Sequence, residues 1–468
     1  MSIPCTLESF NLPDLITLAM ISARNSGCPN IRQVACPADT FLTDLSPWIP
    51  DFIDALTRPL TAEEAADGTY APPVPPRIAM TGTYDEMMAY FEGDLVAQYS
   101  GGPYAWMTDG GPVVPPTEER VARMLTGTSH SPDEVIEFSK GKYTATIERI
   151  AVNAVMAGCK PEYMPVVLSI AETGACVGYG GDMAKGHMYV VSGPIGKEIG
   201  MNQGFALLTS GNPANVSLKR VCSLMGINLG KCEFGINMLE RTGPHSWGTI
   251  FAENPNTPWD TLNVNFGYDA DESVLVYWSS DVLLVPFKNI YISESMRTLE
   301  DVQCSSPEAL VETLKLTSQG AIALFCPDTA FHWASKYDCA KTMQTLKDYL
   351  WDNVTQRADD WYSSYLMVTH PEFMRKYEAK ERGTRQLNPD HLNLPDDAQV
   401  PKLDSPDSIV IVVAGGTGDC QTWGPTFGPP NTYSIDKWRY ATATTDKQRG
   451  GISEVVPEIW TKKGGRGI

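Results

Sequence analysis

The sequence predicts an α/β protein of mixed α+β type, multi-layered and loop-rich, with two to three packed units. Three observations predict this class. Segments with the periodicity of strands alternate with helical segments over most of the chain. The chain has 468 residues, more than one compact core of ordinary size holds. Its 39 glycines and 35 prolines indicate many tight connections.

The first unit is expected to span residues 1–70. It contains a strand-like piece, NIRQVAC at 30–36, and a helical piece, SPWIPDFIDALTRPLTAEEAA at 46–66. Four prolines then fall between residues 72 and 76. Because proline excludes a helix interior, this stretch is predicted to be an extended linker.

A central α/β domain is expected over residues 71–300. It begins with a predicted helix at 84–96. A second helix is predicted after Thr117, a good N-cap, because Glu118 and Glu119 follow where a helix N-terminus prefers negative charge. The segment 146–158 has apolar residues at helical spacing and further apolar residues on its other side, so this helix is predicted to be largely buried.

Later segments continue the alternation of strands and helices. GHMYVVSGPIGKEIG (186–200) is predicted to form a strand, a Gly-Pro turn and a short helix, and a loop then leads into a helix near Pro213. Two domain-sized segments follow, an α/β continuation over 301–400 and a C-terminal piece over 401–468 with a buried strand that runs into a glycine turn. The other predicted strands lie at 249–255, 273–278 and 321–326, and the other predicted helices at 306–319 and 340–354.

Composition excludes several classes of function. The formal net charge is −20 and is spread along the chain, which argues against nucleic acid or an anionic membrane as the main partner. The N-terminus lacks the basic start and apolar core of a secretory signal, and the longest apolar runs are too short to span a membrane. We therefore expect a cytoplasmic protein that binds a small molecule, and an oligomer, as is common for proteins of this size.

Cysteine and motif patterns leave the cofactor unknown. The 11 cysteines are an odd number scattered along the chain, which favours free thiols over a disulfide framework. No cysteine or histidine spacing is typical of a zinc site, so we expect no metal. There is also no Walker motif, no kinase motif set and no GxSxG.

Cys159 is the first candidate catalytic residue. Gly158 suits a left-handed helix end and Pro161 suits the first turn of a new helix, so Cys159 is predicted to lie at the corner between two helices. A helix N-terminus and Lys160 both favour a thiolate, whereas Glu162 opposes it. The alternative is an inert packing thiol, because burial raises the pKa of a cysteine.

Two glycine-rich loops are candidates for binding. The loop from Gly200 to Asn215 offers a polar cradle for an anion, with Asn202, Gly204 and Asn215 as its predicted contacts. An ordinary structural loop is the alternative. Gly415 and Gly416 follow a buried strand as in phosphate-binding turns, but no complete nucleotide motif is present, and a tight turn is the better interpretation.

Three further residues are candidates for acid–base chemistry. His245 is the best placed of the six histidines. Glu253 follows an apolar strand, where a carboxylate is desolvated and its pKa is raised. Asp109 lies in TDGGP. The alternatives are a loop histidine, a solvated or helix-capping glutamate and a turn aspartate.

Several of these segments resemble a family of bacterial proteins that occur beside, or fused to, the UGSC module, a small domain named for selenocysteine or cysteine followed by Gly-Ser-Cys. The resemblance lies in ALTRPLTAEEA, PRIAMTGTYDEMMAYF, TDGGPVVPPTEERVARMLTGT, IAVNAVMAGCKPEYMPVVL, VSGPIGKEIGMNQG, FAENPNTPW and IVIVVAGGTGD, and it covers roughly residues 49–419. It implies an α/β protein with thiol or selenol chemistry. It also implies roles in binding for Asn153, Asn202, Gly204, Asn215 and Trp259, which match the family's motifs.

The chain departs from this family at several positions. His245 and Ser246 stand where relatives read Gly-Lys, and Asp419 and Cys420 stand where one branch reads Lys-His. Two basic groups are thereby lost, and His245 is a candidate replacement for one of them. The segment 30–61 resembles the tail of a UGSC module, yet the module's own motif is absent. A separate UGSC-type partner chain is therefore one expectation.

The leading hypothesis is an enzyme, or the large subunit of one, that acts on a small organic metabolite. It would cleave or form a carbon–heteroatom bond as a lyase or hydrolase, with Cys159 as nucleophile, Glu162 or Glu253 as acid–base group and the Asn202 to Asn215 loop as the polar cradle. One alternative is a thiol-based oxidoreductase that works with a UGSC-type partner through Cys28, Cys36 and Cys420. The other is a non-catalytic binding subunit or pseudo-enzyme.

Overall fold

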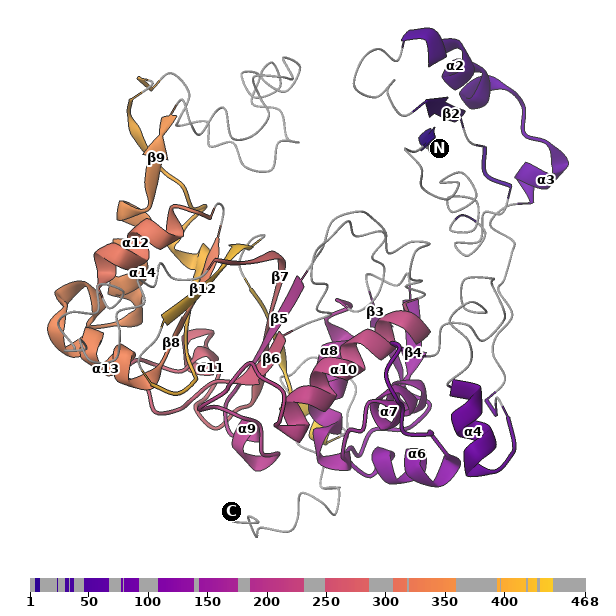
Figure 1. The fold of residues 1–468 in the computed structure, drawn as a ribbon, viewed down its shortest axis with the longest axis horizontal. Coiled ribbons are helices and arrows are strands. Elements are labelled where there is room, and N and C mark those ends of the chain that lie inside the picture. Colours follow the sequence, from indigo (N-terminus) through magenta and orange to yellow (C-terminus); the bar gives the residue numbers. More distant parts are fainter. Residues whose placement is uncertain are drawn as a thin grey trace. The chain divides into compact units, whose positions relative to one another are not determined.

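The computed structural model describes the chain in segments, and it divides the chain into two compact units. Unit 1 comprises Met1–Pro115, Cys176–Met183 and Leu224–Gly243, and unit 2 comprises Pro116–Ala175, Ala184–Ser223 and Pro244–Ile468. The described residues are 5–8, 23, 30–32, 34–37, 46–66, 77–78, 80–91, 108–138, 143–175, 186–230, 249–285, 306–317, 320–358, 394–395, 397–417, 420–426 and 430–440. Helices and several sheets, the largest of them mixed, confirm the predicted α+β class among the described residues (Figure 1).

Unit 1 contains short elements, and one arginine joins two of its helices. Its strands β1 (Cys5–Glu8) and β2 (Val34–Pro37) pair in parallel, and its helices are η2 (Ser46–Trp48), α2 (Ile49–Thr57), α3 (Ala62–Ala65) and α4 (Tyr84–Phe91). Arg32 donates to both carboxylate oxygens of Glu64, at 2.6 and 2.7 Å, and to the carbonyls of Ala55, Arg58 and Pro59. The guanidinium therefore joins the end of α2 to the start of α3.

The predicted helical piece 46–66 is two α-helices rather than one. Helix α2 stops at Thr57, just before Pro59, which has no backbone N–H to continue a helix. Helix α3 restarts at Thr61, whose hydroxyl accepts from the backbone of Glu64 while the Glu64 carboxylate accepts from the backbone of Thr61. The predicted proline linker at 72–76 lies outside the described residues.

Unit 2 is built on a seven-stranded mixed sheet. Its strand order is β11-β8-β12-β7-β5-β6, and β13 also pairs with β7. The two parallel pairs are β11 with β8 and β5 with β6, and the other pairings are antiparallel. The strands are β5 (Gly186–Ser192), β6 (Thr249–Ala252), β7 (Val274–Val285), β8 (Ala321–Phe325), β11 (Ile409–Val413), β12 (Cys420–Thr426) and β13 (Asn431–Ser434).

The two strands at the ends of this order approach each other. The backbone N–H of Asn254, two residues beyond β6, donates to the carbonyl of Val413, the last residue of β11, at 2.7 Å. Alternate residues of β5, β6, β7, β8 and β11 share one buried cluster that includes Val190, Phe251, Val276 and Val412. The sheet therefore curves around this cluster, and the segment after β6 reaches the end of β11.

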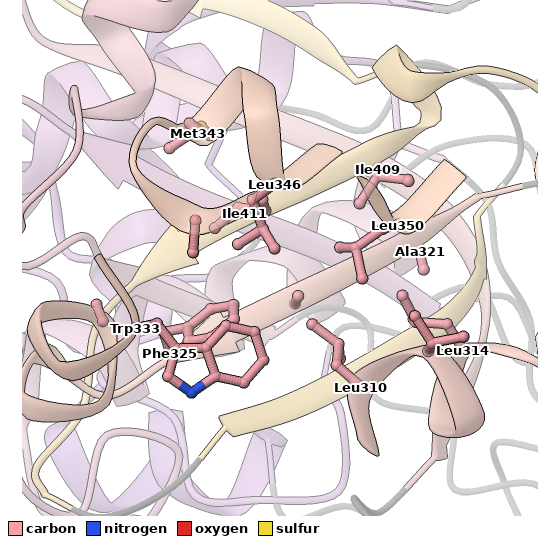
Figure 2. Close-up of a cluster of buried hydrophobic side chains, with 14 of the residues drawn as sticks. Leu310, Leu314, Ala321, Phe325, Trp333, Met343, Leu346, Leu350, Ile409 and Ile411 are labelled. Carbon is pink, nitrogen blue, oxygen red and sulfur yellow. The ribbon is translucent and has the colours of Figure 1, made fainter. Parts of the chain in front are cut away.

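A second buried cluster fills the space between β8, β11 and three helices (Figure 2). Strands β8 and β11 contribute the residues between those of the first cluster, among them Phe325 and Ile411, as the alternation of side chains along a strand requires. Trp333 packs edge-on against Phe325 with ring centroids 4.9 Å apart. The helices are α12 (Pro307–Leu314), α13 (Pro327–Lys336) and α14 (Met343–Asn353).

The predicted corner between two helices is present. Helix α7 (Ile147–Met156) starts at the N-cap Thr146, Gly158 has φ of 81°, and η3 (Pro161–Tyr163) leads into α8 (Met164–Glu172). Most residues of α7 and nearly all of α8 are buried, as predicted for 146–158. The predicted start of α6 (Glu118–Leu125) is also confirmed, because the Thr117 hydroxyl accepts from the backbone of Arg120.

The remaining described elements are short or connect these layers. Helix α9 (Ile195–Glu198) follows Gly193 with φ of 95°, and α10 (Pro213–Asn228) follows the predicted glycine-rich loop. No helix among the described residues combines the length and apolar character needed to cross a membrane. The others are β3 (Val135–Phe138), β4 (Tyr143–Thr146), β9 (Thr355–Arg357), β10 (Gln399–Pro401), α11 (Leu262–Asn265), α17 (Asp436–Arg439), η6 (Asp338–Ala340) and η9 (Pro406–Ser408).

Candidate active site

The carboxyl group of Glu253 is buried where strand β6 ends. Val191 of β5 pairs with Ala252 of β6 in parallel register, and the N–H of Glu253 donates to the Val191 carbonyl at 2.9 Å. Ser192 and Glu253 are therefore the next neighbours across the two strands, on the same face as Val190 and Phe251. This face belongs to the first buried cluster, which explains why Glu253 is only 4% exposed.

Two groups donate to this carboxylate. The Ser192 hydroxyl donates to Oε2 at 2.6 Å, and the backbone N–H of Leu262, the first residue of α11, lies 2.9 Å from Oε2 and 3.2 Å from Oε1. Burial raises the pKa of Glu253 to about 7, although both of these hydrogen bonds lower it in part. The carboxylate is thus desolvated, as predicted. It also accepts from the first N–H of α11, as the alternative interpretation of a capping glutamate predicts.

Asn263 fixes the position of the Ser192 hydroxyl. Its backbone N–H donates to Ser192 Oγ at 2.9 Å, and its side-chain Oδ1 lies 3.1 Å from the same Oγ. The Nδ2 group donates to the carbonyls of Asp269, Ala270 and Glu272, which fixes the orientation of the amide. The single proton of Ser192 therefore has two acceptors, Glu253 Oε2 and Asn263 Oδ1.

The Glu253 carboxyl group has hydrogen-bond partners whether it is ionised or protonated. When the carboxyl is ionised, Ser192 donates to it, and Asn263 Oδ1 still accepts from the Thr261 hydroxyl at 2.6 Å. When the carboxyl is protonated, it donates to Ser192, and Ser192 turns its own proton to Asn263 Oδ1. A buried carboxyl with a pKa near 7 and two satisfied states is suited to accept and release a proton at neutral pH.

Gln203 joins three of the predicted segments. Its Nε2 donates to the Glu253 carbonyl at 2.8 Å, and its backbone carbonyl accepts from Gly415 N at 2.9 Å and from Asn254 Nδ2 at 3.3 Å. The glycine-rich loop, the end of β6 and the glycine turn after β11 therefore meet at this residue. The ends of parallel strands are where α/β proteins commonly bind ligands.

Gly415 and Gly416 form the tight turn that the sequence predicts. Gly415 has φ of 97°, a conformation that side chains rarely adopt. A Cβ on Gly416 would lie 2.4 Å from Cδ1 of Phe205, so the absent side chain lets the Phe205 ring pack onto the turn. A Cβ on Gly415 would lie 3.5 Å from Sγ of Cys326, which places this cysteine beside the same turn.

The predicted polar cradle is organised mainly by its own hydrogen bonds. Asn202 N donates to Asn215 Oδ1 at 3.0 Å, Gly204 N donates to Asn202 Oδ1 at 3.0 Å, and Asn202 Nδ2 donates to the Phe205 carbonyl at 2.8 Å. Asn212 Nδ2 donates to the Gly200 carbonyl at 2.9 Å. These bonds favour the structural-loop alternative for Asn202 and Gly204.

Cys159 is half-buried as a residue, and its thiol does not have the surroundings of a thiolate. Its N–H donates to the Ala154 carbonyl at 2.9 Å, which continues the end of α7, and burial raises the pKa of its thiol well above the usual range. The Ser217 hydroxyl of α10 donates to the carbonyl of the preceding Gly158 at 3.3 Å. These observations favour the packing alternative over a thiolate. Glu162, in η3, is half-buried and has no described contact with Glu253.

Two residues implied by the family resemblance have structural contacts. Trp259 donates from Nε1 to the Ala340 carbonyl at 2.9 Å and packs edge-on against Phe325, so it belongs to the second cluster. Asn153 donates to the carbonyl of Arg149 one turn earlier in α7. Neither contact favours a role in binding substrate.

The other two acid–base candidates lie outside the described part of unit 2. His245 lies outside the described residues. Asp109 belongs to unit 1, is exposed, and accepts from Gly111 N at 3.4 Å across a turn in which Gly110 has φ of 85°. This geometry fits the turn alternative for Asp109. Cys28 and the side chains of Cys36 and Cys420 also lie outside the described part of the chain.

Sequence reasoning missed three residues of the candidate site. Ser192 and Gln203 lie inside predicted segments, but a serine at a strand end and a glutamine in a loop are common and carry no motif. Asn263 lies in a four-residue helix that no periodicity reveals. One signal was available in the sequence. Two predicted strands run from apolar residues into polar ones, at Ser192-Gly193 and at Glu253-Asn254, and pairing of these strands would bring Ser192 to Glu253.

Within the described residues, no group of three or more His, Cys, Asp or Glu side chains is placed to hold a metal ion. No protein-family model, curated protein or solved structure matches this chain. The resemblance to the UGSC-associated family therefore stays a prediction, and the function is argued from the site alone.

Proposed function

We propose that this protein is an enzyme, or the large subunit of one, that acts on a small organic metabolite and uses Glu253 as its general acid–base group. The observation that carries the proposal is the buried Glu253 carboxyl, whose pKa is raised to about 7 where three loops meet at Gln203. A catalytic acid or base is most effective when its pKa lies near the working pH. Strongly perturbed carboxyl groups are enriched at functional sites.

The reaction type follows from what this group does. A carboxyl that is half protonated near pH 7 removes a proton from carbon or from water, and returns one to a leaving oxygen or nitrogen. Cleavage or formation of a carbon–heteroatom bond, as in a lyase or a hydrolase, needs both steps. Ser192 and Asn263 would act as positioning residues, since they hold the carboxyl and exchange hydrogen bonds as it titrates.

Cys159 has no part in this proposal. A thiol whose pKa is raised by burial is a poor nucleophile at neutral pH. The sequence-based mechanism is therefore revised to one in which proton transfer by Glu253 replaces attack by Cys159. The protein is further proposed to be cytoplasmic and oligomeric, and a UGSC-type partner chain stays an expectation that native mass spectrometry of the purified protein would test.

A deuterium-exchange assay tests the proposal without a known substrate. The protein is incubated in D₂O with a defined pool of small hydroxy, amino, keto and phosphorylated acids, and each acid is followed by mass spectrometry. We expect time-dependent deuteration or conversion of at least one pool member. The Glu253→Gln variant should lower that rate about 100-fold or more, in line with the usual contribution of general acid–base catalysis.

Two controls accompany this assay. Glu312→Gln changes a glutamate on α12 that is paired with Lys315 at the surface, and it should leave the rate unchanged. Folding of each variant is checked by circular dichroism. Equal rates for wild type and Glu253→Gln, with both proteins folded, would contradict the role of Glu253.

A binding subunit without catalysis is the second candidate. It is favoured by one observation, that both oxygens of Glu253 already lie near internal donors, as in a carboxylate that only caps a helix. This candidate predicts that members of the same pool raise the melting temperature of the protein and are never deuterated or converted. The same incubation therefore distinguishes the two candidates.

A further inference from the structure

Helix α10 begins next to the candidate site with a largely satisfied first turn. It spans 16 residues, and the preceding Asn212 accepts from Asn215 N through Oδ1 and from Val216 N through its carbonyl, each at 3.0 Å. The first turn of a helix carries the positive end of its dipole, which favours an anionic group. By itself this feature identifies no ligand.

The side chain of Asn215 supplies the second observation. The residue is 6% exposed, and its Oδ1 accepts from Asn202 N at 3.0 Å, a bond that fixes which end of the amide carries the NH₂ group. No acceptor within the described part of the chain reaches Asn215 Nδ2, which is buried. A buried donor without an acceptor is uncommon and costs about 1–3 kcal/mol.

The Asn215 amide lies near the N-terminus of α10. Side chains of a helix tilt toward its N-terminus, and the bond to Oδ1 comes from Asn202, on the loop that precedes α10, so the amide lies at the start of the helix. Asn215 lies in the first turn, so its NH₂ group and the positive end of the helix dipole act on the same region. Lys219 lies four residues later, on the same face of α10, and is exposed.

We propose that Asn215 Nδ2 and the N-terminus of α10 form a subsite for an oxyanion, a carboxylate or phosphate group of the substrate. An oxygen of such a group accepts from the NH₂ group, interacts with the helix dipole and is attracted by Lys219. The assignment of this group to the substrate rests on the proposed function. Gln203, which follows Asn202, donates to the Glu253 carbonyl and so links the subsite to the proposed acid–base group.

Binding of simple anions to the resting protein tests this subsite separately from catalysis. Inorganic phosphate and sodium acetate are titrated at constant ionic strength with chloride as the reference, and binding is followed by nuclear magnetic resonance of the asparagine side-chain NH₂ groups. We expect saturable binding of at least one probe, with a shift of the Asn215 resonances. Stronger binding of phosphate indicates a phosphorylated substrate, and stronger binding of acetate indicates a carboxylic acid.

The decisive variant is Asn215→Asp, with Ser210→Asp as its matched control. The carboxylate introduced by Asn215→Asp retains an oxygen that accepts from Asn202 N, but it replaces the NH₂ group with a second oxygen that repels an anion. We expect this variant to weaken anion binding about tenfold or more, whereas the same charge at the exposed Ser210 has an effect of about twofold or less. Lys219→Gln changes an exposed residue and should weaken anion binding about threefold. This variant tests the subsite if Asn215→Asp does not fold.

Several results would overturn the inference. The first is that neither probe binds saturably to the wild-type protein. The second is that Asn215→Asp and Ser210→Asp weaken anion binding equally. The third, which applies if Asn215→Asp does not fold, is that Lys219→Gln binds the probes as tightly as the wild type. Glu253→Gln should bind the probes as the wild type does. A Glu253→Gln protein that binds phosphate yet shows wild-type turnover would contradict the proposed function alone, and an active wild type that binds neither probe would contradict the subsite alone.

Discussion

The Ser192 hydroxyl lies 2.6 Å from Glu253 Oε2 and joins the last residue of β5 to the first residue after β6. This hydrogen bond lowers the pKa of a carboxyl that burial raises to about 7. The balance between burial and the two donors, the Ser192 hydroxyl and the Leu262 N–H, therefore sets the proportion of Glu253 that is ionised at neutral pH.

Removal of the hydroxyl should raise the pKa of Glu253 further. In Ser192→Ala the carboxylate loses its side-chain donor and keeps only the Leu262 N–H, so its ionised form is less stabilised. We expect the pH–rate profile of the wild-type reaction to shift to higher pH in this variant. A profile that keeps its midpoint while the rate falls would show that Ser192 supports the fold and does not tune Glu253.

Stability should fall as pH rises between about 4.5 and 7 because of Glu253. In this range the unfolded chain releases the Glu253 proton, whereas the folded protein retains it, since the folded-state pKa is the higher one. The penalty is absent below pH 4.5 and is complete above pH 7, where it amounts to about 3 kcal/mol. Glu253→Gln carries no such proton.

Denaturant unfolding at several pH values measures this effect. The difference in unfolding free energy between Glu253→Gln and the wild type should increase across the range, in favour of the variant. Glu312→Gln removes a surface carboxyl group and is measured in the same way. It shows how much of the pH dependence follows from the loss of an ordinary exposed glutamate. A difference that is constant from pH 4 to pH 8 would mean that Glu253 is ionised in the folded protein at the usual pH.

Gly416 and Phe205 should be energetically coupled. An alanine at 416 would place its Cβ 2.4 Å from Phe205 Cδ1, but the Phe205 side chain is 73% exposed and has room to move away. We expect Gly416→Ala to destabilise the protein by about 1 kcal/mol, and by almost nothing in a Phe205→Ala background. Equal effects in both backgrounds would place the strain of Gly416→Ala in the backbone instead.

Cys159 should be unreactive in the folded protein. Because burial raises the pKa of its thiol, brief treatment with an alkylating reagent at pH 7 should leave it unmodified until denaturant is added. Peptide mapping by mass spectrometry measures this for each cysteine. Cys159→Ala should accordingly keep the deuterium-exchange activity. Alkylation of Cys159 at pH 7 in the folded protein would restore the nucleophile hypothesis.

Much of unit 2 could be predicted from the sequence because its signals are local. Thr117 and Thr146 are N-caps, Gly158 and Pro161 mark a corner, and the apolar run before Gly415 is a buried strand. Helix α13 and strands β12 and β13 were not predicted, because their sequences lack a clear apolar period. The two strands also depend on pairing with distant segments. The break between α2 and α3 was missed although Pro59 marks it.

The candidate site was only partly predictable for the same reason. Burial of Glu253 follows from its place after an apolar strand, and the sequence indicates this. Its contact with Ser192 depends on the parallel register of β5 and β6, and the two residues are 61 positions apart in the chain. Its link to Gly415 depends on Gln203. Hydrogen bonds between distant loops leave no periodic pattern in a sequence.

A carbon-13 titration of Glu253 measures the protonation of its carboxyl group directly. Protein labelled at the glutamate carboxyl carbon is titrated from pH 4 to pH 9, and the Glu253 resonance is assigned as the one missing from Glu253→Gln. We expect a midpoint at about pH 7, shifted upward in Ser192→Ala. A midpoint near 4.5, the value of an exposed glutamate, would contradict both the proton state and the catalytic role proposed for this residue.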